Sequence, residues 1–353
     1  MKRLLQSFAT VWLSASLLTS ATAVTITTQP ISKAINQGQA TSFSVAASGT
    51  GTLSYQWQKD GLDIPGAVVS VYAIANAQPW SIGNYSVKIN DSGTSATSNV
   101  ATLSINGVNS GIWRGLSSYY PFNGNSNDQS LNNKNATANG ASLIADKLGQ
   151  ANAAYTLDGQ DDWIDLGEWT QEPVFTISMW VMPSIKQTGD NVILDNSHFT
   201  GSNFVIQSGY QDFNNYSFNS DPSLALRTDI PGDRWQHIVV GHTGSTKFLY
   251  LNGSLVSEIP SEQIQYSTEK RLSIGRWEYS NAESYGGRRY WAGAVDDVRT
   301  YNRALSPAEI EALHASEAIP YAQTISFAAI PNKLTTDSVT LTATGGTQSS
   351  CVY

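Results

Sequence analysis

The sequence predicts an all-β protein, made of two consecutive β-sandwiches and the start of a further all-β repeat. Apolar and polar side chains alternate in short runs, for example at Tyr85, Val87 and Ile89, as in strands with one buried face. Turn-forming clusters such as residues 90–93 (Asn-Asp-Ser-Gly) separate these runs. Hydrophobic residues make up 41% of the 353 residues and aromatics 10%, which is enough to build packed cores.

Composition and charge exclude several classes of function. The chain has 20 Lys and Arg against 28 Asp and Glu, a net charge of −8, which argues against a partner that is a nucleic acid or an anionic membrane. The single cysteine, Cys351, excludes a disulfide framework and a cysteine-rich zinc site. Four histidines leave little for histidine-based metal or acid–base chemistry.

Residues 1–23 have the pattern of a cleaved export signal. Lys2 and Arg3 form a basic start, an apolar run follows to Leu18, and Ala21-Thr22-Ala23 provides a small-residue cleavage site. The run is too short and too polar for a transmembrane segment, and a buried helix is the alternative. We therefore expect an extracellular protein, secreted or at the cell surface.

In residues 24–107, apolar and polar side chains alternate between turn signals, as in an all-β sandwich. The spacing of four core residues, which serve as landmarks, is more specific. Trp57 follows Val45 by twelve residues, and Tyr85 precedes Val87 by two. This stretch resembles a bacterial immunoglobulin-like domain, with valine at both positions where related domains carry cysteine. The resemblance implies a spacer whose sheets are held together by packing on Trp57.

Residues 108–117 read as a Gly/Ser/Asn linker, and residues 118–318 as a larger sandwich of the jelly-roll type. One helix is expected near its end. Ser306 is the predicted N-cap, Pro307 takes the first helical position, and Glu309 completes a capping box ahead of an apolar pair.

The second segment also resembles a known family. Its motifs match, in order, those of a laminin-G-like, concanavalin A-like lectin/glucanase jelly roll. They are Tyr119-Tyr120-Pro121-Phe122-Asn123-Gly124, Tyr155-Thr156-Leu157-Asp158-Gly159, Trp180 with its flanking strand, Leu249-Tyr250-Leu251-Asn252-Gly253, and Gly293-Ala294-Val295-Asp296-Asp297-Val298-Arg299. Residues 319–353 resemble the first strands of a second, truncated immunoglobulin-like repeat, too short to fold alone.

The sequence favours binding over catalysis. Retaining glycosidases place two carboxylates about 5 Å apart across the scissile bond. No strand-like run carries Asp or Glu at i, i+2 and i+4, and the group from Asp158 to Asp165 has the wrong period. We expect no enzyme, although a Ser-His-Asp group assembled from distant positions stays open.

Calcium is the cofactor that the sequence favours. Calcium takes six to eight oxygen ligands, and related sandwiches bind a structural calcium where the start of the domain meets a closing-strand aspartate. Carried over, this implicates Asp128 and Asp296, with Asn123 and Gly124. Because side chains alternate along a strand, Asp296 is expected on the same face as Val298. If that face is the core, the ionised carboxylate needs a compensating partner. The alternative is a simple Asn/Gly turn, with Asp296 paired to an arginine.

Two further acidic groups have simpler interpretations. Asp158-Gly159, with Asp161 and Asp162 nearby, is first of all a hairpin turn signal. Asp297 and Arg299 are expected to form an exposed surface pair of little energetic value.

Carbohydrate is the ligand that the aromatic residues favour. Sugar rings pack on exposed aromatic faces, while polar side chains bond the hydroxyls. Two polar, aromatic-rich segments fit, and we take Trp277, Tyr279 and Tyr210 as the candidate contacts. The remaining tryptophans are expected in cores, namely Trp57, Trp163, Trp180, Trp235 and Trp291.

The sequence therefore predicts an exported modular protein whose jelly roll binds carbohydrate or another matrix component in adhesion, without catalysis. The low charge, 14% of residues, suits hydrogen bonding to neutral polymers. The alternatives are an accessory region of a longer extracellular hydrolase and a spacer without a ligand.

Overall fold

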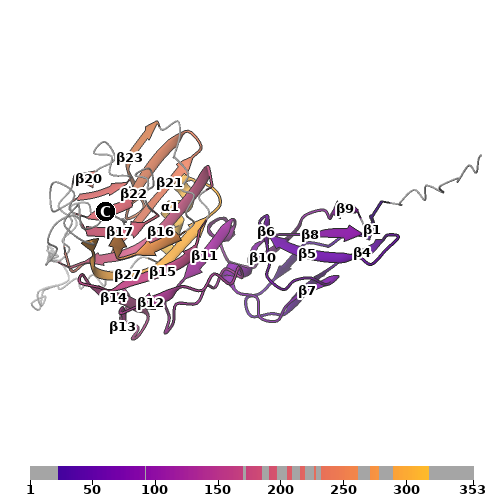
Figure 1. The fold of residues 1–353 in the computed structure, drawn as a ribbon, viewed down its shortest axis with the longest axis horizontal. Helices are drawn as coiled ribbons and strands as arrows, with labels where there is room; N and C mark the ends of the chain where they lie inside the picture. Colours follow the sequence, from indigo (N-terminus) through magenta and orange to yellow (C-terminus); the bar gives the residue numbers. More distant parts are fainter. Residues whose placement is uncertain are drawn as a thin grey trace, which may run out of the picture.

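The computed structural model describes residues 23–91, 93–169, 172–184, 191–196, 205–208, 215–218, 226–227, 232–260, 271–277 and 289–317. Within them the chain forms short strands, two 3-10 turns and one α-helix, arranged as two β units in series (Figure 1). The all-β prediction is confirmed. No helix in this part of the chain is long and apolar enough to cross a membrane. The predicted export signal up to residue 22 and the predicted third segment lie outside the described residues.

The N-terminal unit contains three small sheets. The largest has the order β2-β10-β8-β5-β6, with β9 on β8, and pairs β3–β7 and β1–β4 complete the unit. Its elements are β1 Thr25–Thr28, β2 Lys33–Ile35, β3 Thr41–Ser44, β4 Ala46–Ser48, β5 Ser54–Lys59, β6 Leu62–Asp63, β7 Val71–Ile74, η1 Pro79–Ser81, β8 Gly83–Asp91, β9 Thr94–Thr97 and β10 Ala101–Ile105.

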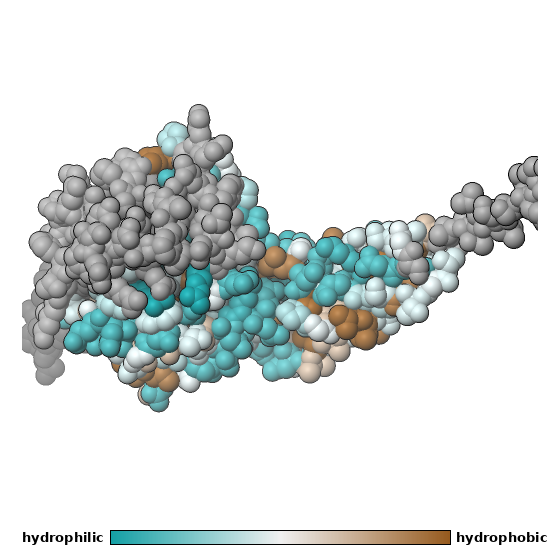
Figure 2. Space-filling view, in the orientation of Figure 1, coloured by the Kyte–Doolittle hydropathy of each residue, from teal (hydrophilic) through white to brown (hydrophobic). Residues whose placement is uncertain are grey.

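The core of this unit contains the landmarks that the sequence singled out. Trp57 and Tyr85 are fully buried, in one apolar cluster with Val45 and Val87. The Tyr85 hydroxyl donates a 2.6 Å hydrogen bond to the carbonyl of Ser81, four residues upstream. Exposed hydrophobic residues also lie on this unit (Figure 2), including three at and just before β7, namely Val68, Val69 and Val71.

The second unit is built from two large antiparallel sheets. The eight-stranded sheet has the order β13-β14-β27-β16-β21-β22-β23, with β11 on β27, and the seven-stranded sheet the order β12-β15-β24-β17-β18-β19-β20. The elements of the eight-stranded sheet are β11 Leu116–Tyr120, β13 Ser142–Ile144, β14 Ala154–Asp158, β16 Val174–Pro183, β21 Gln236–Thr243, β22 Thr246–Leu251, β23 Ser254–Pro260 and β27 Ala292–Tyr301. The other elements are η2 Gly111–Trp113, β12 Thr137–Asn139, β15 Trp163–Glu168, β17 Asn191–Asp195, β18 Val205–Ser208, β19 Asn215–Phe218, β20 Leu226–Arg227, β24 Arg271–Ile274, and the pair β25 Arg276–Trp277 with β26 Arg289–Tyr290.

The main core lies between these two sheets, because alternate residues of each strand point inward. In β16, Ile177, Met179 and Val181 face this core, and in β15 Ile164 and Leu166 do. Trp291 is fully buried in the same cluster, as expected.

Strand β27 contains a β-bulge that reverses the predicted facing of Asp296. Trp180 of β16 pairs with Asp296, and Ser178 pairs with Arg299. The one residue between them on β16 therefore lies opposite two residues of β27, Asp297 and Val298. Asp297 has φ +47°, an uncommon value for a residue other than glycine. Val298 packs in the main core. Asp296 instead lies beside Trp180 on the outer face of the sheet, so its predicted placement on the side of Val298 is wrong.

Helix α1 (Pro307–Glu317) begins where the sequence predicts. The backbone N–H of Ser306 donates to Oε2 of Glu309 at 2.8 Å, and the N–H of Glu309 donates to the Ser306 hydroxyl at 3.3 Å. Its buried residues, Ile310 and Leu313, pack in a second, smaller core on the outer face of the eight-stranded sheet. The helix therefore covers part of that face.

The two units meet through aromatic side chains at this smaller core. Trp113 of η2 lies 6.4 Å from Trp80 of the N-terminal unit and 5.6 Å from Tyr119 of β11, measured between ring centroids. Asn302 also donates a side-chain hydrogen bond to the carbonyl of Asp60 at 3.2 Å. The segment between the units is thus anchored to both.

Candidate functional site

Asp128, the first predicted calcium ligand, organises the loop that follows β11. Its Oδ1 accepts hydrogen bonds from the backbone N–H groups of Tyr119 and Ser130, at 2.9 and 2.8 Å. Its Oδ2 accepts from the Ser130 hydroxyl at 2.9 Å and from the N–H of Lys134 at 3.0 Å. Both oxygens therefore have protein donors already.

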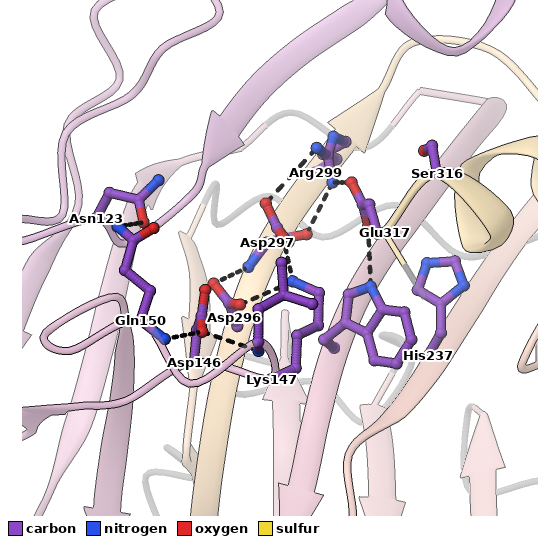
Figure 3. Close-up of polar contacts among 12 residues, drawn as sticks. Asn123, Asp146, Lys147, Gln150, His237, Asp296, Asp297, Arg299, Ser316 and Glu317 are labelled. Carbon is purple, nitrogen blue, oxygen red and sulfur yellow. Dashed lines mark hydrogen bonds and ion pairs between the residues drawn. The ribbon is translucent and has the colours of Figure 1, made fainter. Parts of the chain in front are cut away.

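Asp296, the second predicted ligand, pairs with Lys147 rather than with an arginine. The Lys147 ammonium lies 2.9 Å from Oδ2 of Asp296 and also binds Asp297. Asn123 lies to the side of this pair in Figure 3, where it accepts a 3.5 Å hydrogen bond from Gln150. The N–H of Gly124 donates to the carbonyl of Asn152 at 2.8 Å. Calcium at Asp296 would require Lys147 to move away, and calcium binding stays a prediction.

The Asp158-Gly159 turn joins the two sheets instead of closing a hairpin. It is followed by β15 in the seven-stranded sheet, whereas β14 belongs to the eight-stranded sheet, so the hairpin interpretation is wrong. The ligand atoms of Asp158, Asp161 and Asp162 lie within 4.8 Å of one another at the surface. The backbone N–H groups of residues 160 and 161 donate to Asp158, as in an ordinary Asx turn.

The outer face of the seven-stranded sheet carries polar and aromatic side chains side by side. Because Ile164 and Leu166 point into the main core, Trp163 and Asp165 point outward. The Arg276 guanidinium lies 3.1 Å from the centroid of the Trp163 ring. Trp163 is half-buried on this face and absent from the core clusters, so its predicted place in a core is wrong.

Three polar residues lie in a row across this face. Ser273 of β24 pairs with Asp165 on one side and with Asp195 of β17 on the other. The carboxylates thus belong to strands two positions apart, about 10 Å between Cα atoms. A sequence pattern of Asp or Glu at i, i+2 and i+4 within one strand does not reveal such a pair, because its members lie on different strands. Asp195 is only 3% exposed, so the two do not both reach a substrate as a glycosidase mechanism requires.

Of the predicted sugar contacts, the structure describes one. Trp277 is half-buried in β25 and pairs with Arg289 of β26. Adjacent side chains of a strand point to opposite faces, so the stacking of Arg276 on Trp163 does not place Trp277 on this outer face, and its sugar contact stays a prediction. Tyr210 and Tyr279 lie outside the described residues.

A serine and a histidine do come together, but in the interior. The Ser178 hydroxyl lies 2.7 Å from Nε2 of His237, and both side chains are fully buried. Burial lowers the pKa of His237 well below its usual value, with a smaller contribution from His314. Nδ1 of His237 has no hydrogen-bond partner in the part of the chain described, where a triad would place a carboxylate. A substrate has no access to this pair.

Asp297 and Arg299 do form the predicted pair, but its predicted exposure is wrong, and no sequence pattern indicated this: the Asp297 side chain is only 15% exposed. Arg299 is 2% exposed and lies 3.9 Å above the Tyr119 ring. It binds Asp297 at 3.6 Å and Glu317 of α1 at 2.5 Å, and the Trp180 indole also donates to Glu317 (Figure 3). With Lys147 and Asp296 these residues form one group, the buried charge cluster, on the outer face of the eight-stranded sheet.

Burial and charge set the ionisation of this cluster. Burial raises the pKa of Asp296 to about 7, and the neighbouring Asp297 adds to the shift. Burial likewise raises the pKa of Glu317 to about 7, in spite of Arg299. Burial by itself would raise the pKa of Asp297, but the charges of Arg299 and Lys147 hold this pKa below its ordinary value. Three carboxyl groups thus share two cations, and near neutral pH the cluster retains protons.

Comparison with known proteins agrees with the topology of the second unit. Residues 158–311 match a family model, Laminin_G_3, described as the concanavalin A-like lectin/glucanases superfamily. Together with the two stacked sheets, the match defines this region as a concanavalin A-like jelly-roll domain. No curated protein matches the chain.

Solved structures of similar shape include three proteins that act on or bind carbohydrate. Domain 4 of AbnA, an extracellular arabinanase from Geobacillus stearothermophilus solved with arabinotriose, is 19% identical with a TM-score of 0.44, covering 56% of this chain and 98% of that one. Botulinum neurotoxin type C, described as interacting with two gangliosides, is 16% identical with a TM-score of 0.44, over 57% and 51%. A Trypanosoma rangeli sialidase mutant is 13% identical with a TM-score of 0.45, over 67% and 43%. This chain thus matches about half, or less, of the toxin and sialidase chains.

Proposed function

We propose that this chain is an exported, modular protein whose jelly roll binds carbohydrate or another extracellular matrix component, without catalysis, in an adhesion-like role. The observation that carries the proposal is the outer face of the seven-stranded sheet, in the segment that matches a lectin/glucanase family. There, half-buried Trp163 and Asp165 point outward on one strand, and the buried Ser273 lies across from Asp165 on the next.

These side chains have the chemistry that sugar recognition needs. An indole offers a flat apolar surface for the C–H face of a pyranose or furanose ring. A carboxylate next to it, that of the half-buried Asp165, accepts hydrogen bonds from the ring hydroxyls and orients the sugar. The stacked Arg276 holds the Trp163 ring in place, so the site is preorganised.

The N-terminal unit, residues 24–107, acts in this proposal as an immunoglobulin-like spacer. The hydrogen bond from Tyr85 to Ser81 supports this, because a tyrosine bonded to upstream backbone is typical of immunoglobulin-type sandwiches. Burial of Trp57 between Val45 and Val87 supports it too, since no disulfide links those positions.

The test is retention of the purified chain on immobilised neutral polysaccharides such as xylan, arabinan, mannan and cellulose. We expect Trp163→Ala and Trp277→Ala to lose retention at a temperature where calorimetry shows each variant still folded, although the loss of a half-buried ring lowers the melting temperature. Tyr55→Ala, which removes a half-buried aromatic from the N-terminal unit, is the matched control and should be retained. Full retention of both tryptophan variants would contradict this site.

The alternative function is an accessory region of a longer extracellular hydrolase. The family match of residues 158–311, whose description covers lectins and glucanases alike, is the feature that favours a link to hydrolysis. Release of reducing sugar from any of these polysaccharides by the purified chain, abolished in Asp165→Asn, would establish turnover and overturn the proposal of binding alone.

A further inference from the structure

Lys147 and Asp296 are held in direct contact although 149 positions separate them in the sequence. Lys147 belongs to the connection between β13 and β14, and Asp296 belongs to β27. The side-chain nitrogen Nζ of Lys147 lies 2.9 Å from Oδ2 of Asp296, and the two side chains are only 3% and 2% exposed. An amine and a carboxyl group are the two reactants of an amide bond, and the fold holds them together without a diffusional encounter.

The bulge in β27 brings a second carboxylate to the same amine. Neighbouring residues of a regular strand point to opposite faces, yet Asp296 and Asp297 both bind Nζ of Lys147 (Figure 3). The left-handed backbone of Asp297, with φ +47°, accompanies this arrangement. Such a conformation costs free energy in a residue other than glycine, and it often marks a functional site. Lys147 thus contacts one carboxyl group with which it can react and another that can take its proton.

Asp297 is oriented for proton transfer. Its Oδ1 accepts a 2.8 Å hydrogen bond from the Tyr119 hydroxyl and lies 3.6 Å from Arg299, which leaves Oδ2 for Lys147. Burial by itself would lower the pKa of Lys147, but the charges of Asp297 and Asp296 raise this pKa above its ordinary value. The amine therefore becomes a nucleophile only after it gives up a proton, and the Asp297 carboxylate is in contact to accept it.

Asp296 is oriented as the electrophile. Its Oδ1 accepts a 2.7 Å hydrogen bond from the backbone N–H of Asp297, while Oδ2 faces Lys147. The same N–H stabilises the negative charge that develops on Oδ1 when the amine attacks Cγ, as the donors of an oxyanion hole do. Oδ2 is then the oxygen that leaves. Three carboxyl groups share two cations in this cluster, which favours a proton on one of them.

We propose that Lys147 and Asp296 form an intramolecular amide bond in the folded chain, with Asp297 as the catalytic base and acid. Asp297 takes a proton from the Lys147 ammonium, and the free amine attacks Cγ of the protonated Asp296. Asp297 returns the proton to the departing Oδ2 hydroxyl, so that the Cγ–Oδ2 bond breaks and water leaves. The nitrogen loses one further proton to solvent. Ammonium and carboxylic acid thus give one amide, one water and one proton, without any further reactant. Asp296 is a titratable carboxyl group only until the bond forms.

The bond would act as a covalent staple of the jelly roll. It replaces a buried ion pair, whose desolvation is costly, by a neutral amide. It also closes a loop from residue 147 to residue 296, and a crosslink across a long loop stabilises by constraining the unfolded chain. The single cysteine of the sequence, Cys351, cannot form such a link within the chain.

The test is mass spectrometry of tryptic peptides from the purified full chain, unfolded before digestion. Trypsin cuts after Lys and Arg, so an unlinked chain gives residues 135–147, 148–186 and 290–299 as separate peptides. An amide at Lys147 blocks cleavage there, and the linked chain gives residues 135–186 joined to 290–299, lighter by one water. We expect the joined peptide. Separate peptides only, even after prolonged incubation of the folded chain, overturn the proposal and leave a plain ion pair.

Variants test the assigned roles. Lys147→Arg keeps the positive charge but removes the amine, so we expect no joined peptide. Asp297→Asn keeps both reactants and removes the base, and the joined fraction at a fixed time should fall at least about tenfold, since general acid–base catalysis contributes roughly 10²–10⁴-fold in rate. Asp146→Asn changes a neighbouring carboxylate that binds only backbone N–H groups, and it is the matched control that should link like the wild type. Circular dichroism checks that each variant is folded. A folded Asp297→Asn variant that links as fast as the wild type overturns the proton transfer through Asp297.

Discussion

Replacement of Trp113 by alanine should uncouple the two units. Trp113 stands between Trp80 and Tyr119, with centroid distances of 6.4 and 5.6 Å, and 5.2 Å from the Arg299 guanidinium. In the wild type, unfolding one unit removes these contacts from the other. We therefore expect the wild type to melt in one transition and Trp113→Ala in two.

The size of the effect follows from buried area. Trp113 is half-buried, so we take about 130 Å² of apolar surface removed from water, worth roughly 3 kcal/mol at about 25 cal/mol per Å². Each ring pair adds about 0.5–1.5 kcal/mol, and compactness of the unfolded chain reduces the sum. The expected loss is about 3–4 kcal/mol.

Differential scanning calorimetry measures both effects together. Trp80→Ala should uncouple the units in the same way from the other side of the contact. Tyr55→Ala, away from the junction, should destabilise the N-terminal unit and keep the wild-type number of transitions. A Trp113→Ala variant that loses less than about 1 kcal/mol and melts like the wild type would refute the aromatic contact as the coupling element.

Three further results are expected. While it is a free carboxyl group, Asp296 should titrate near pH 7 in a carboxyl-carbon NMR experiment. Its pKa is about 7 in the folded protein against an ordinary value of 3.8, so the folded state holds its proton more tightly than the unfolded state. The stabilisation from the protonated Asp296 is therefore full below pH 3.8 and is lost as the pH rises to about 7. That loss amounts to up to about 4 kcal/mol, and a midpoint below pH 5 would contradict the burial argument. Tyr85→Phe should cost about 1–2 kcal/mol in urea unfolding, because it leaves the Ser81 carbonyl without its donor, and an unchanged midpoint would count against this. If calcium binds at Asp128 and Asp296, a chelator should lower the melting temperature and added calcium should restore it, whereas an unchanged transition means no structural calcium.

Local features of this chain were predictable because their causes are local. The capping box at Ser306 and Glu309 depends on residues three apart, and it forms as expected. The alternation around Tyr85 and Val87 depends on a period of two along one strand, and those residues are buried. Such patterns require no knowledge of which strands become neighbours.

The candidate site depends on neighbours, and for that reason the sequence did not predict it. Asp165, Ser273 and Asp195 are far apart along the chain and are aligned only by strand register. Asp296 faces away from Val298 because of a bulge at Asp297, and an aspartate gives no sequence signal for positive φ as a glycine would. Period-two reasoning fails at such a residue, since one extra position reverses every facing beyond it.

Coverage of one sheet explains why Arg299 is buried and Asp297 only slightly exposed. A residue pattern along β27 indicates which face a side chain takes, but not what lies against that face. Helix α1, Ile112 and Trp113 of η2, and Trp80 all pack on the outer face of the eight-stranded sheet. That face therefore serves to join the units, and charges placed on it must be paired, as the buried charge cluster is. Trp163 stands on the outer face of the other sheet, away from this contact. Separation of the two units should therefore spare the carbohydrate site proposed at Trp163.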